Sequence, residues 1–138
     1  MAEPFFVSVD VAVPPDRAWS VIGDPCGITS WYPTYVSCEV DGDRRTLRRA
    51  DGAKLIERLL NRDDDRRAYS YMVVAGLPLR YHHARFSVDP TPDGCRIVWE
   101  TTAEHHDPLV NMQERLAGRQ REALEGLKRL LEAGELGE

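Results

Sequence analysis

Glu57 is the side chain in this sequence that is best suited to chemistry. It stands in the segment Lys54–Asn61, where Leu55 and Leu59 share its alternation. A carboxylate that faces inward among apolar side chains loses hydration, which raises its pKa toward values that suit proton transfer. In the alternative, Glu57 hydrogen-bonds Tyr71 or a water and only orients a ligand. We favour the orienting role, because carboxylates with a shifted pKa often serve structure rather than catalysis.

Aromatic and basic residues are the next candidates for a binding site. Tyr69, Tyr71 and Trp99 have flat faces for stacking and polar tips for hydrogen bonding, although as core residues they would need no function. Arg49 points either inward, as an anchor for an anion, or outward into solvent. It belongs to a basic cluster that we interpret as an edge-strand device against sheet pairing, made of Arg44, Arg45, Arg48 and Arg49.

Two histidine pairs, His82-His83 and His105-His106, raise the question of a metal site. Neighbours on a strand point to opposite faces, so at most His82 and His105 reach the interior together, where Glu57 could add an oxygen ligand. No ligand spacing supports such a site and the cysteines are scattered, so we expect no metal and no cofactor. Nucleophilic catalysis is disfavoured too, since no serine lies in a strand-turn-helix elbow and no cysteine has a marked basic neighbour one helix turn away.

Composition limits the class of protein. With 138 residues, the chain is long enough for one domain, residues 1–138, with a core that needs no metal or disulfide. The net charge of -5 argues against nucleic acid or an anionic membrane as the main partner, and no apolar run approaches the ~20 residues of a membrane span. The three cysteines, Cys26, Cys38 and Cys95, show no paired spacing, and no secretory leader precedes them. We therefore expect a reduced, cytoplasmic protein.

The first half of the chain must position these residues through short elements. Apolar and polar residues alternate from Phe5 to Val13, which predicts a half-buried strand. Helical spacing follows at Asp16–Ile22, and a second short helical turn is expected at Gly27–Trp31. Period-two segments joined by tight turns then predict strands at Tyr35–Asp41, Arg44–Arg49, Lys54–Asn61, Ala68–Val74, Arg80–Val88 and Cys95–His106. About seven strands result, nearly all in one antiparallel meander.

A long amphipathic helix is predicted at Asp107–Ala133. Asp107 and Pro108 are typical of a helix start, and Gly134 is typical of a helix end. Gln120 lies within the apolar stripe, which suits the wall of a cavity as well as a core. On this reading, replacement of Gln120 by leucine should be tolerated. The stripe consists of Leu109, Met112, Leu116, Ala123, Leu124, Leu127, Leu130 and Leu131.

The register of the strands decides which side chains line the interior. In the last hairpin, Phe86 and Val88 must share a face with Ile97 and Trp99, because a slip of one residue would move either pair into water. This pairing also turns inward His82, Ala84, Thr101, Ala103 and His105.

The strand Lys54–Asn61 can be paired in two registers. Direct pairing of Leu59 with Tyr69 turns Glu57 inward. Closure of the Asp51-Gly52 hairpin with a two-residue loop favours the opposite face, which would bring inside Ile56, Arg58 and Leu60. Periodicity alone leaves both registers open, and a bulge can reconcile them.

Several strings carry a resemblance to a known superfamily. They are residues 13–24 (VPPDRAWSVIGD), Trp31-Tyr32-Pro33, the string Ile56-Glu57-Arg58-Leu59 followed by residues 64–69 (DDRRAY), and Val98-Trp99 before the final helix. In this order, and over essentially the whole chain, they resemble the START-related, birch-allergen-like proteins (SRPBCC), which include polyketide cyclases/dehydrases and lipid-transport proteins. The resemblance implies an α+β helix-grip fold. In that fold, a curved antiparallel sheet of about seven strands wraps around a long C-terminal helix, with two short helices after the first strand.

The resemblance also implies a cavity between the sheet and the long helix. Glu57, Tyr69, Tyr71 and Val73 match positions that line the ligand pocket of plant-hormone-receptor relatives. The long gate loop of those receptors is missing here, because residues 50–53 form only a tight turn. Hormone-receptor signalling is therefore not implied.

Two functions from different classes follow. The first is binding of a hydrophobic small molecule, such as a lipid, a polyketide or an aromatic metabolite, in a cavity that opens near Trp31, Tyr32 and the Leu77-Pro78-Leu79 turn. The second is an enzyme of the cyclase, dehydratase or aromatase type with Glu57 or a histidine as acid or base. The sequence leaves a homodimer open. The expected ligand contacts are Trp31, Glu57, Leu59, Tyr69, Tyr71, Val73, His82, Ala84, Phe86, Trp99, Thr101, Leu116 and Gln120, with Glu57 the candidate catalytic residue.

Overall fold

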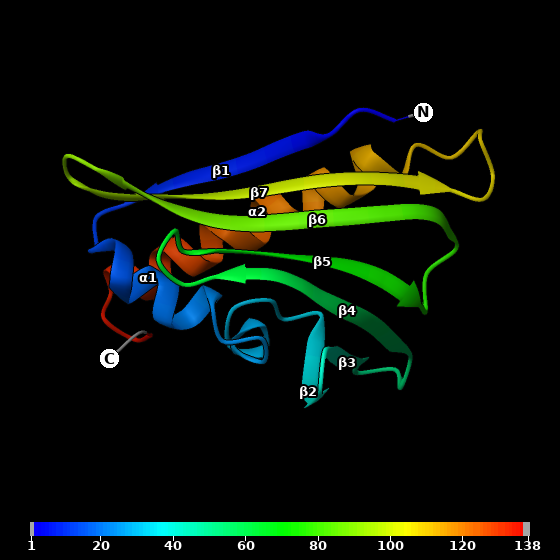
Figure 1. Ribbon diagram of the computed structural model, residues 1–138, viewed down its shortest axis with the longest axis horizontal. Helices are drawn as coiled ribbons and strands as arrows, with labels where there is room; N and C mark the ends of the chain where they lie inside the picture. The colour runs from blue at the N-terminus through cyan, green and yellow to red at the C-terminus, as the bar shows by residue number, and fades with distance from the viewer. Residues whose placement is uncertain (1, 137–138) are drawn as a thin grey trace.

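One curved antiparallel sheet and one long helix dominate the computed structural model, which describes residues 2–136 (Figure 1). The seven strands lie in the order β1-β7-β6-β5-β4-β3-β2. This is the helix-grip arrangement that the sequence strings implied. In chain order the elements are β1 (Phe5–Val11), α1 (Pro15–Ile22), the 3-10 helix η1 (Gly27–Ser30), β2 (Tyr35–Asp41), β3 (Arg44–Arg49), β4 (Lys54–Asp63), β5 (Ala68–Ala75), β6 (Leu79–Thr91), β7 (Gly94–His105) and α2 (Met112–Glu132).

The β6–β7 hairpin has the predicted register. Phe86 pairs with Trp99 and Val88 pairs with Ile97, and all four side chains are buried. The neighbours expected on this face, His82, Ala84, Thr101 and Ala103, are buried as well. His105 differs: it lies at the frayed end of the hairpin and is only half-buried.

Glu57 faces the interior, and the competing register of β4 is wrong. Leu47 pairs with Leu55 rather than with Ile56, because the hairpin loop is one residue longer than a two-residue turn. Gly52, with φ at +87°, supplies the left-handed residue that such a three-residue loop requires. Arg58, which the competing register would have turned inward, is exposed.

The pairing of β4 with β5 is shifted by two residues from the expected one. Leu59 lies opposite Tyr71 instead of Tyr69, and Glu57 lies opposite Val73. Irregularities between Ile56 and Glu57, and between Leu60 and Asp63, absorb the difference. A shift of two leaves every side chain on its own face, so the inward position of Glu57 is unaffected.

The long helix begins later than predicted. Asp107 accepts a hydrogen bond from the backbone of Leu109 and closes a turn, after which Asn111 caps α2 by accepting from the backbone of Glu114 at 3.1 Å. The expected start at Asp107 is therefore wrong, and the helix is about 30 Å long. Its end is as expected, with Gly134 at φ +76° just after the last turn.

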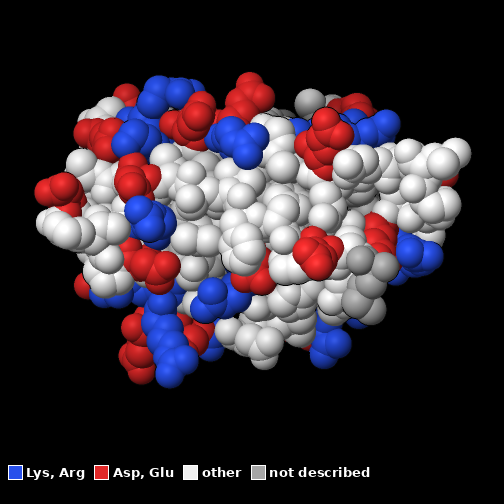
Figure 2. Space-filling model, turned by 90° about the horizontal axis from the view of Figure 1, so that it is seen from above, with Lys and Arg blue, Asp and Glu red and all other residues white. Residues whose placement is uncertain are grey.

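The long helix and the residues after α1 both pack into the core. The buried face of α2, which includes Leu124, Leu127 and Leu131, packs against β1 and β7. The helix η1 lies beside β2, and the Trp31 ring that follows it contacts the rings of Phe86 and Trp99. No helix within residues 2–136 is long and apolar enough to cross a bilayer. On the face shown in Figure 2, acidic and basic side chains lie side by side around a central area of uncharged residues.

A disulfide joins Cys26, next to η1, to Cys38 in β2. The expectation of three reduced cysteines is therefore wrong for these two, while Cys95 is a free, buried thiol. The Cα atoms of the pair lie 5.4 Å apart because η1 folds back against β2, a contact that spacing in the sequence does not reveal. The bond closes residues 26–38 into a covalent loop.

Candidate functional site

A small polar cavity lies between the sheet, η1 and the first half of α2. Its volume is about 40 Å³, which is room for about one water molecule. Three tyrosines and the side chains of Glu57, His82 and Gln120 line it in addition to apolar residues, so its wall is more polar than that of a core void. We call it the inner cavity; its lining is Ile28, Tyr32, Tyr35, Leu55, Glu57, Tyr71, Val73, Leu77, His82, Trp99, Leu116 and Gln120.

An ion pair between Arg45 and Glu57 anchors this cavity. The two residues face each other across β3 and β4, and Arg45 is fully buried. Both Nε and Nη2 of Arg45 contact Oε1 of Glu57, at 2.8 and 2.6 Å. Nη1 donates to the carbonyl of Pro25 at 2.8 Å and to the Tyr69 hydroxyl at 3.3 Å. The guanidinium also lies 5.1 Å from the centre of the Tyr71 ring.

The role of Arg45 corrects the interpretation of the basic cluster. β3 is not an edge strand, since β2 lies outside it, and only Arg44 and Arg49 of the cluster are exposed. Arg49 pairs with Asp51 at the surface and is no anion anchor of the cavity. A signal for the inward side chain was present in the sequence: Arg45 stands two residues before Leu47, and such residues share a face of a strand.

Only one oxygen of the Glu57 carboxylate is engaged. Both contacts of Arg45 go to Oε1, and within residues 2–136 no group forms a hydrogen bond with Oε2. Burial raises the pKa of the Glu57 carboxyl, and the Arg45 guanidinium opposes the rise. The carboxylate is thus held in place through one oxygen, while the other is available to a molecule in the inner cavity.

Two tyrosine hydroxyls face the same space as donors. The indole nitrogen of Trp99 donates to the Tyr71 oxygen at 2.9 Å, so the hydroxyl proton of Tyr71 is available to a further acceptor. Burial raises the pKa of both Tyr35 and Tyr71 well above the usual value for tyrosine. Both hydroxyls therefore keep their protons at neutral pH.

His82 is a neutral donor with a defined tautomer. The β5–β6 ladder ends at the pair Tyr71 and Ala84, and beyond it the backbone N–H of Val73 donates to Nδ1 of His82 at 3.0 Å. The ring proton must therefore sit on Nε2. Burial, and secondarily the neighbouring His83, lowers the pKa of His82 to about 4. The Tyr71 ring lies beside the imidazole in a tilted arrangement, with ring centres 5.5 Å apart.

Gln120 lines the cavity but is also part of a satisfied pair. Its Nε2 donates to the Thr101 hydroxyl at 3.1 Å, and both side chains are buried. The expectation that leucine would be tolerated at position 120 rested on an unpaired amide, and the hydrogen bond removes that reason. Loss of the amide would leave the Thr101 hydroxyl without this partner.

A larger groove lies on the other side of Tyr32. We call it the outer groove; its volume is about 280 Å³ and its lining is Trp31, Tyr32, Pro33, Thr34, Arg119, Glu122, Ala123, Gly126 and Arg129. Tyr32 lines both the groove and the inner cavity, so the two spaces meet at this residue. The indole nitrogen of Trp31 is buried and has no hydrogen-bond partner in the described part of the chain.

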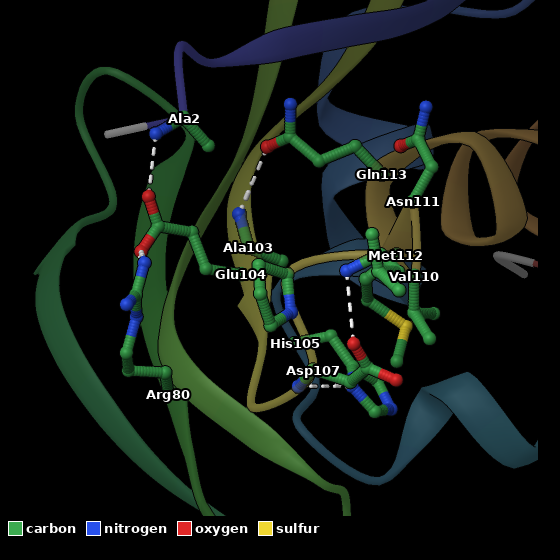
Figure 3. Close-up of a pocket in the computed structure, with 12 residues that line it drawn as sticks. Ala2, Arg80, Ala103, Glu104, His105, Asp107, Val110, Asn111, Met112 and Gln113 are labelled. Atoms are coloured by element: carbon green, nitrogen blue, oxygen red, sulfur yellow. Dashed lines mark hydrogen bonds and ion pairs between the residues drawn. The ribbon is translucent and has the colours of Figure 1, made fainter.

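A polar pocket at the far end of the β6–β7 hairpin holds His105 (Figure 3). Nδ1 of His105 accepts from the backbone of Asp107 at 2.9 Å, and Arg80 pairs with Glu104 at 2.7 Å. His105 therefore lies outside the inner cavity, contrary to the expected inward position. Among residues 2–136, no three histidine, cysteine, aspartate or glutamate side chains are close enough together to hold a metal ion.

The thirteen expected contacts fall into four places. Trp31 lines the outer groove, and Leu59 and Tyr69 line a pocket of about 170 Å³ beside Asn61. The fully buried side chains Ala84, Phe86 and Thr101 are absent from the lining of the inner cavity. The inner cavity collects the rest: Glu57, Tyr71, Val73, His82, Trp99, Leu116 and Gln120. The expected contacts lacked Ile28, Tyr35 and Leu55, as well as Arg45 behind them, while Tyr32 and Leu77 were expected only near the opening of the cavity.

Residues 5–132 match the model of a protein family described as polyketide cyclase/dehydrase and lipid transport. The chain belongs to this family. The match spans almost the whole chain and agrees with the superfamily that the sequence strings resemble. No curated protein matches the chain.

Solved structures share the fold of this polyketide cyclase/dehydrase and lipid transport family member. XoxI from Bacillus cereus is 23% identical, with a TM-score of 0.84 over 94% of each chain. An uncharacterized protein from Bacillus thuringiensis is 21% identical, with a TM-score of 0.83 over 92% of this chain and 97% of that one. Norcoclaurine synthase from Thalictrum flavum, in complex with dopamine and hydroxybenzaldehyde, is 19% identical, with a TM-score of 0.72 over 95% and 87%. At these identities the likeness shows a common fold alone.

Proposed function

We propose that the protein binds a small aromatic or polyketide-type molecule whose hydroxyl or carbonyl group enters the inner cavity. The observation that carries this proposal is the convergence of one acceptor and several donors on a single small space. Oε2 of Glu57 is the acceptor, and the Tyr71 hydroxyl and Nε2 of His82 are donors. A phenol or enol can donate to the first, and a carbonyl can accept from the others.

The size of the site favours a compact ligand over a lipid. Ligand pockets usually measure about 300 to 1,000 Å³, and the inner cavity alone is far smaller. A turn of the Tyr32 side chain would join it to the outer groove, and the two volumes together reach about 320 Å³. That space fits one or two rings, so we narrow the ligand class from lipids in general to aromatic or polyketide-type molecules.

Binding of hydroxybenzaldehyde and dopamine, the compounds bound in the norcoclaurine synthase structure, tests the proposal. Isothermal titration should show binding that weakens about five- to thirty-fold in Tyr71→Phe and in Glu57→Gln, as expected for one polar contact. Tyr81→Phe is the matched control, because Tyr81 is exposed on the outer face of β6. Binding that is equal in all four proteins would contradict the inner cavity as the site. Native mass spectrometry of freshly purified protein would identify a ligand retained from the cell.

A second candidate function is proton transfer on such a ligand. It is favoured by one feature, a carboxylate oxygen without a protein partner beside neutral donors, because that set can take a proton from carbon and stabilise the resulting enolate. Exchange of the methyl protons of hydroxyacetophenone in D2O, followed by NMR, measures this activity. If Glu57 is the base, Glu57→Gln should lower the exchange rate about a hundredfold or more while binding persists. If Glu57 only orients the ligand, as we favour, no catalysed exchange is expected in either protein.

Location and assembly stay predictions. The cysteine pattern that suggested the cytoplasm loses its force, because Cys26 and Cys38 are bonded in the structure. Lysis of intact cells directly into denaturing acid, followed by alkylation of the free thiols of the unfolded protein, tests the compartment. Three alkylated cysteines indicate a reducing compartment, and one, the buried Cys95, indicates an oxidising one. The mass of the purified protein in solution tests the homodimer.

A further inference from the structure

The outer groove carries positive charge that has no partner within residues 2–136. Arg119 and Arg129 both line it, and neither guanidinium has an ion-pair or hydrogen-bond partner in the described part of the chain. They stand ten residues apart on α2, so their Cα atoms are about 15 Å apart along the helix. Arg80 and Arg96, by contrast, are each paired with a carboxylate.

The shape of the groove suits a flat molecule. Trp31 and Tyr32, both mostly buried, line the groove together with α2, where the small residues Ala123 and Gly126 lie between Arg119 and Arg129 in the sequence. Glycine inside a helix is unfavourable relative to alanine, and packing does not require it here, because a Cβ at position 126 would meet only Nη2 of Arg129, at 3.8 Å. Its effect is to keep the groove open beside that guanidinium.

From these observations we propose that the ligand is an aromatic carboxylate, bound with its rings against Trp31 and Tyr32 and its carboxylate beside Arg119 or Arg129. This inference rests on the proposed function, since the opposite end of the same molecule enters the inner cavity past Tyr32. Glu122 also lines the groove and opposes an anion, so the two arginines leave a net charge of one positive unit there. The charge of Glu122 therefore provides an independent check.

A pair of probes that differ only in charge tests the inference. The acid is 6-hydroxy-2-naphthoic acid and the neutral partner is its amide, titrated into the protein at one fixed ionic strength. Arg119→Gln and Arg129→Gln should weaken the acid about three- to tenfold in total and leave the amide unchanged, as expected for exposed charge pairs. Glu122→Gln should strengthen binding of the acid about two- to fivefold. The matched control is Arg121→Gln, because Arg121 is exposed on the same helix and does not line the groove.

Each other outcome overturns the inference in a recognisable way. Equal affinity for the acid and the amide in every variant would show that the groove does not recognise a carboxylate. The proposed function would still hold if Tyr71→Phe weakened the binding of both probes. An effect of Arg121→Gln as large as that of Arg119→Gln assigns the selectivity to the net charge of the protein rather than to the groove. If inorganic phosphate displaces the acid at the same ionic strength and with similar affinity, the arginines bind anions in general and the aromatic residues do not contribute to binding. Absence of binding by both probes overturns this inference and the proposed site together.

Discussion

Acidification should destabilise the protein through His82. The folded state lowers the pKa of this imidazole to about 4, from about 6.5 in an unfolded chain, mainly through burial. Between these values the unfolded state binds more protons than the folded state, so stability falls as the pH falls. From pH 7 to pH 5 this one group should cost about 2 kcal/mol of unfolding free energy, and its contribution is fully lost below about pH 4.

The substitution His82→Asn isolates this effect. The amide oxygen of asparagine can take the place of Nδ1 as acceptor for the Val73 N–H, and asparagine does not titrate. Urea unfolding at pH 7, 6 and 5 should show that the wild-type protein loses about 2 kcal/mol more than the variant, whatever the two stabilities are at pH 7. The comparison with the variant matters because the raised pKa of Glu57 favours proton binding by the folded state, which acts on stability in the opposite sense.

Parallel pH dependences of the two proteins would refute the reasoning, since they would mean that His82 either is protonated in the folded state or is exposed. NMR of the imidazole nitrogens gives a direct second reading. We expect a neutral ring with its proton on Nε2 down to about pH 5. A ring protonated on both nitrogens at pH 6 would show that the Val73 contact is absent in solution.

Three further predictions concern stability. Reduction of the Cys26–Cys38 bond, or its replacement by Cys26→Ser with Cys38→Ser, should lower the free energy of unfolding by about 3 kcal/mol, because the bond closes a loop of sequence separation 12. Urea unfolding with and without dithiothreitol measures this loss. If dithiothreitol also destabilises the double-serine protein, the loss does not come from this disulfide. Arg45→Met should lower the free energy of unfolding by about 3 to 5 kcal/mol, because it leaves the carboxylate of Glu57 buried without its partner. The double variant Arg45→Met with Glu57→Leu should recover much of that loss in urea unfolding. A double variant as unstable as the single one would contradict this explanation. Gln120→Leu should lower the free energy of unfolding by about 1 to 3 kcal/mol, because it leaves the Thr101 hydroxyl unpaired. Addition of Thr101→Val should restore most of this stability. If Gln120→Leu alone stabilises the protein, the hydrogen bond between Gln120 and Thr101 is not formed.

The sequence predicted most of the fold because one face of each strand is buried. Alternation placed Phe86 and Val88 on the same face as Ile97 and Trp99, and the structure has that register. Alternation did not decide which face of β4 is buried. That choice depended on whether the loop that contains Gly52 has two or three residues. The predicted start of the long helix was wrong for a related reason. Asp107 and Asn111 can both cap a helix, and only the folded structure shows that Asn111 does so.

The candidate site was less predictable because it depends on contacts between distant residues. A buried arginine looks like any surface arginine until its carboxylate partner, twelve residues away, is known to lie opposite on the next strand. Tyr32 belongs to a segment without periodicity, and Tyr35 stands at the first position of a predicted strand, so no pattern indicated that they line the same cavity. Tyr71 and His82 were predictable because each follows the alternation of its own strand, whereas Glu57 was predicted inward by one of two open registers and by the family resemblance.

The long helix and the segment around Trp31 contribute different properties to the core. The helix α2 packs on β1 and β7, whereas Trp31 and Tyr32, which line the outer groove, stand in a segment tied to β2 by the Cys26–Cys38 disulfide. Smaller side chains at these two positions would enlarge the cavity without any change in the sheet or the long helix. Evolution, or an engineer, can therefore alter the size of the accepted molecule by two substitutions in one loop and keep the scaffold unchanged.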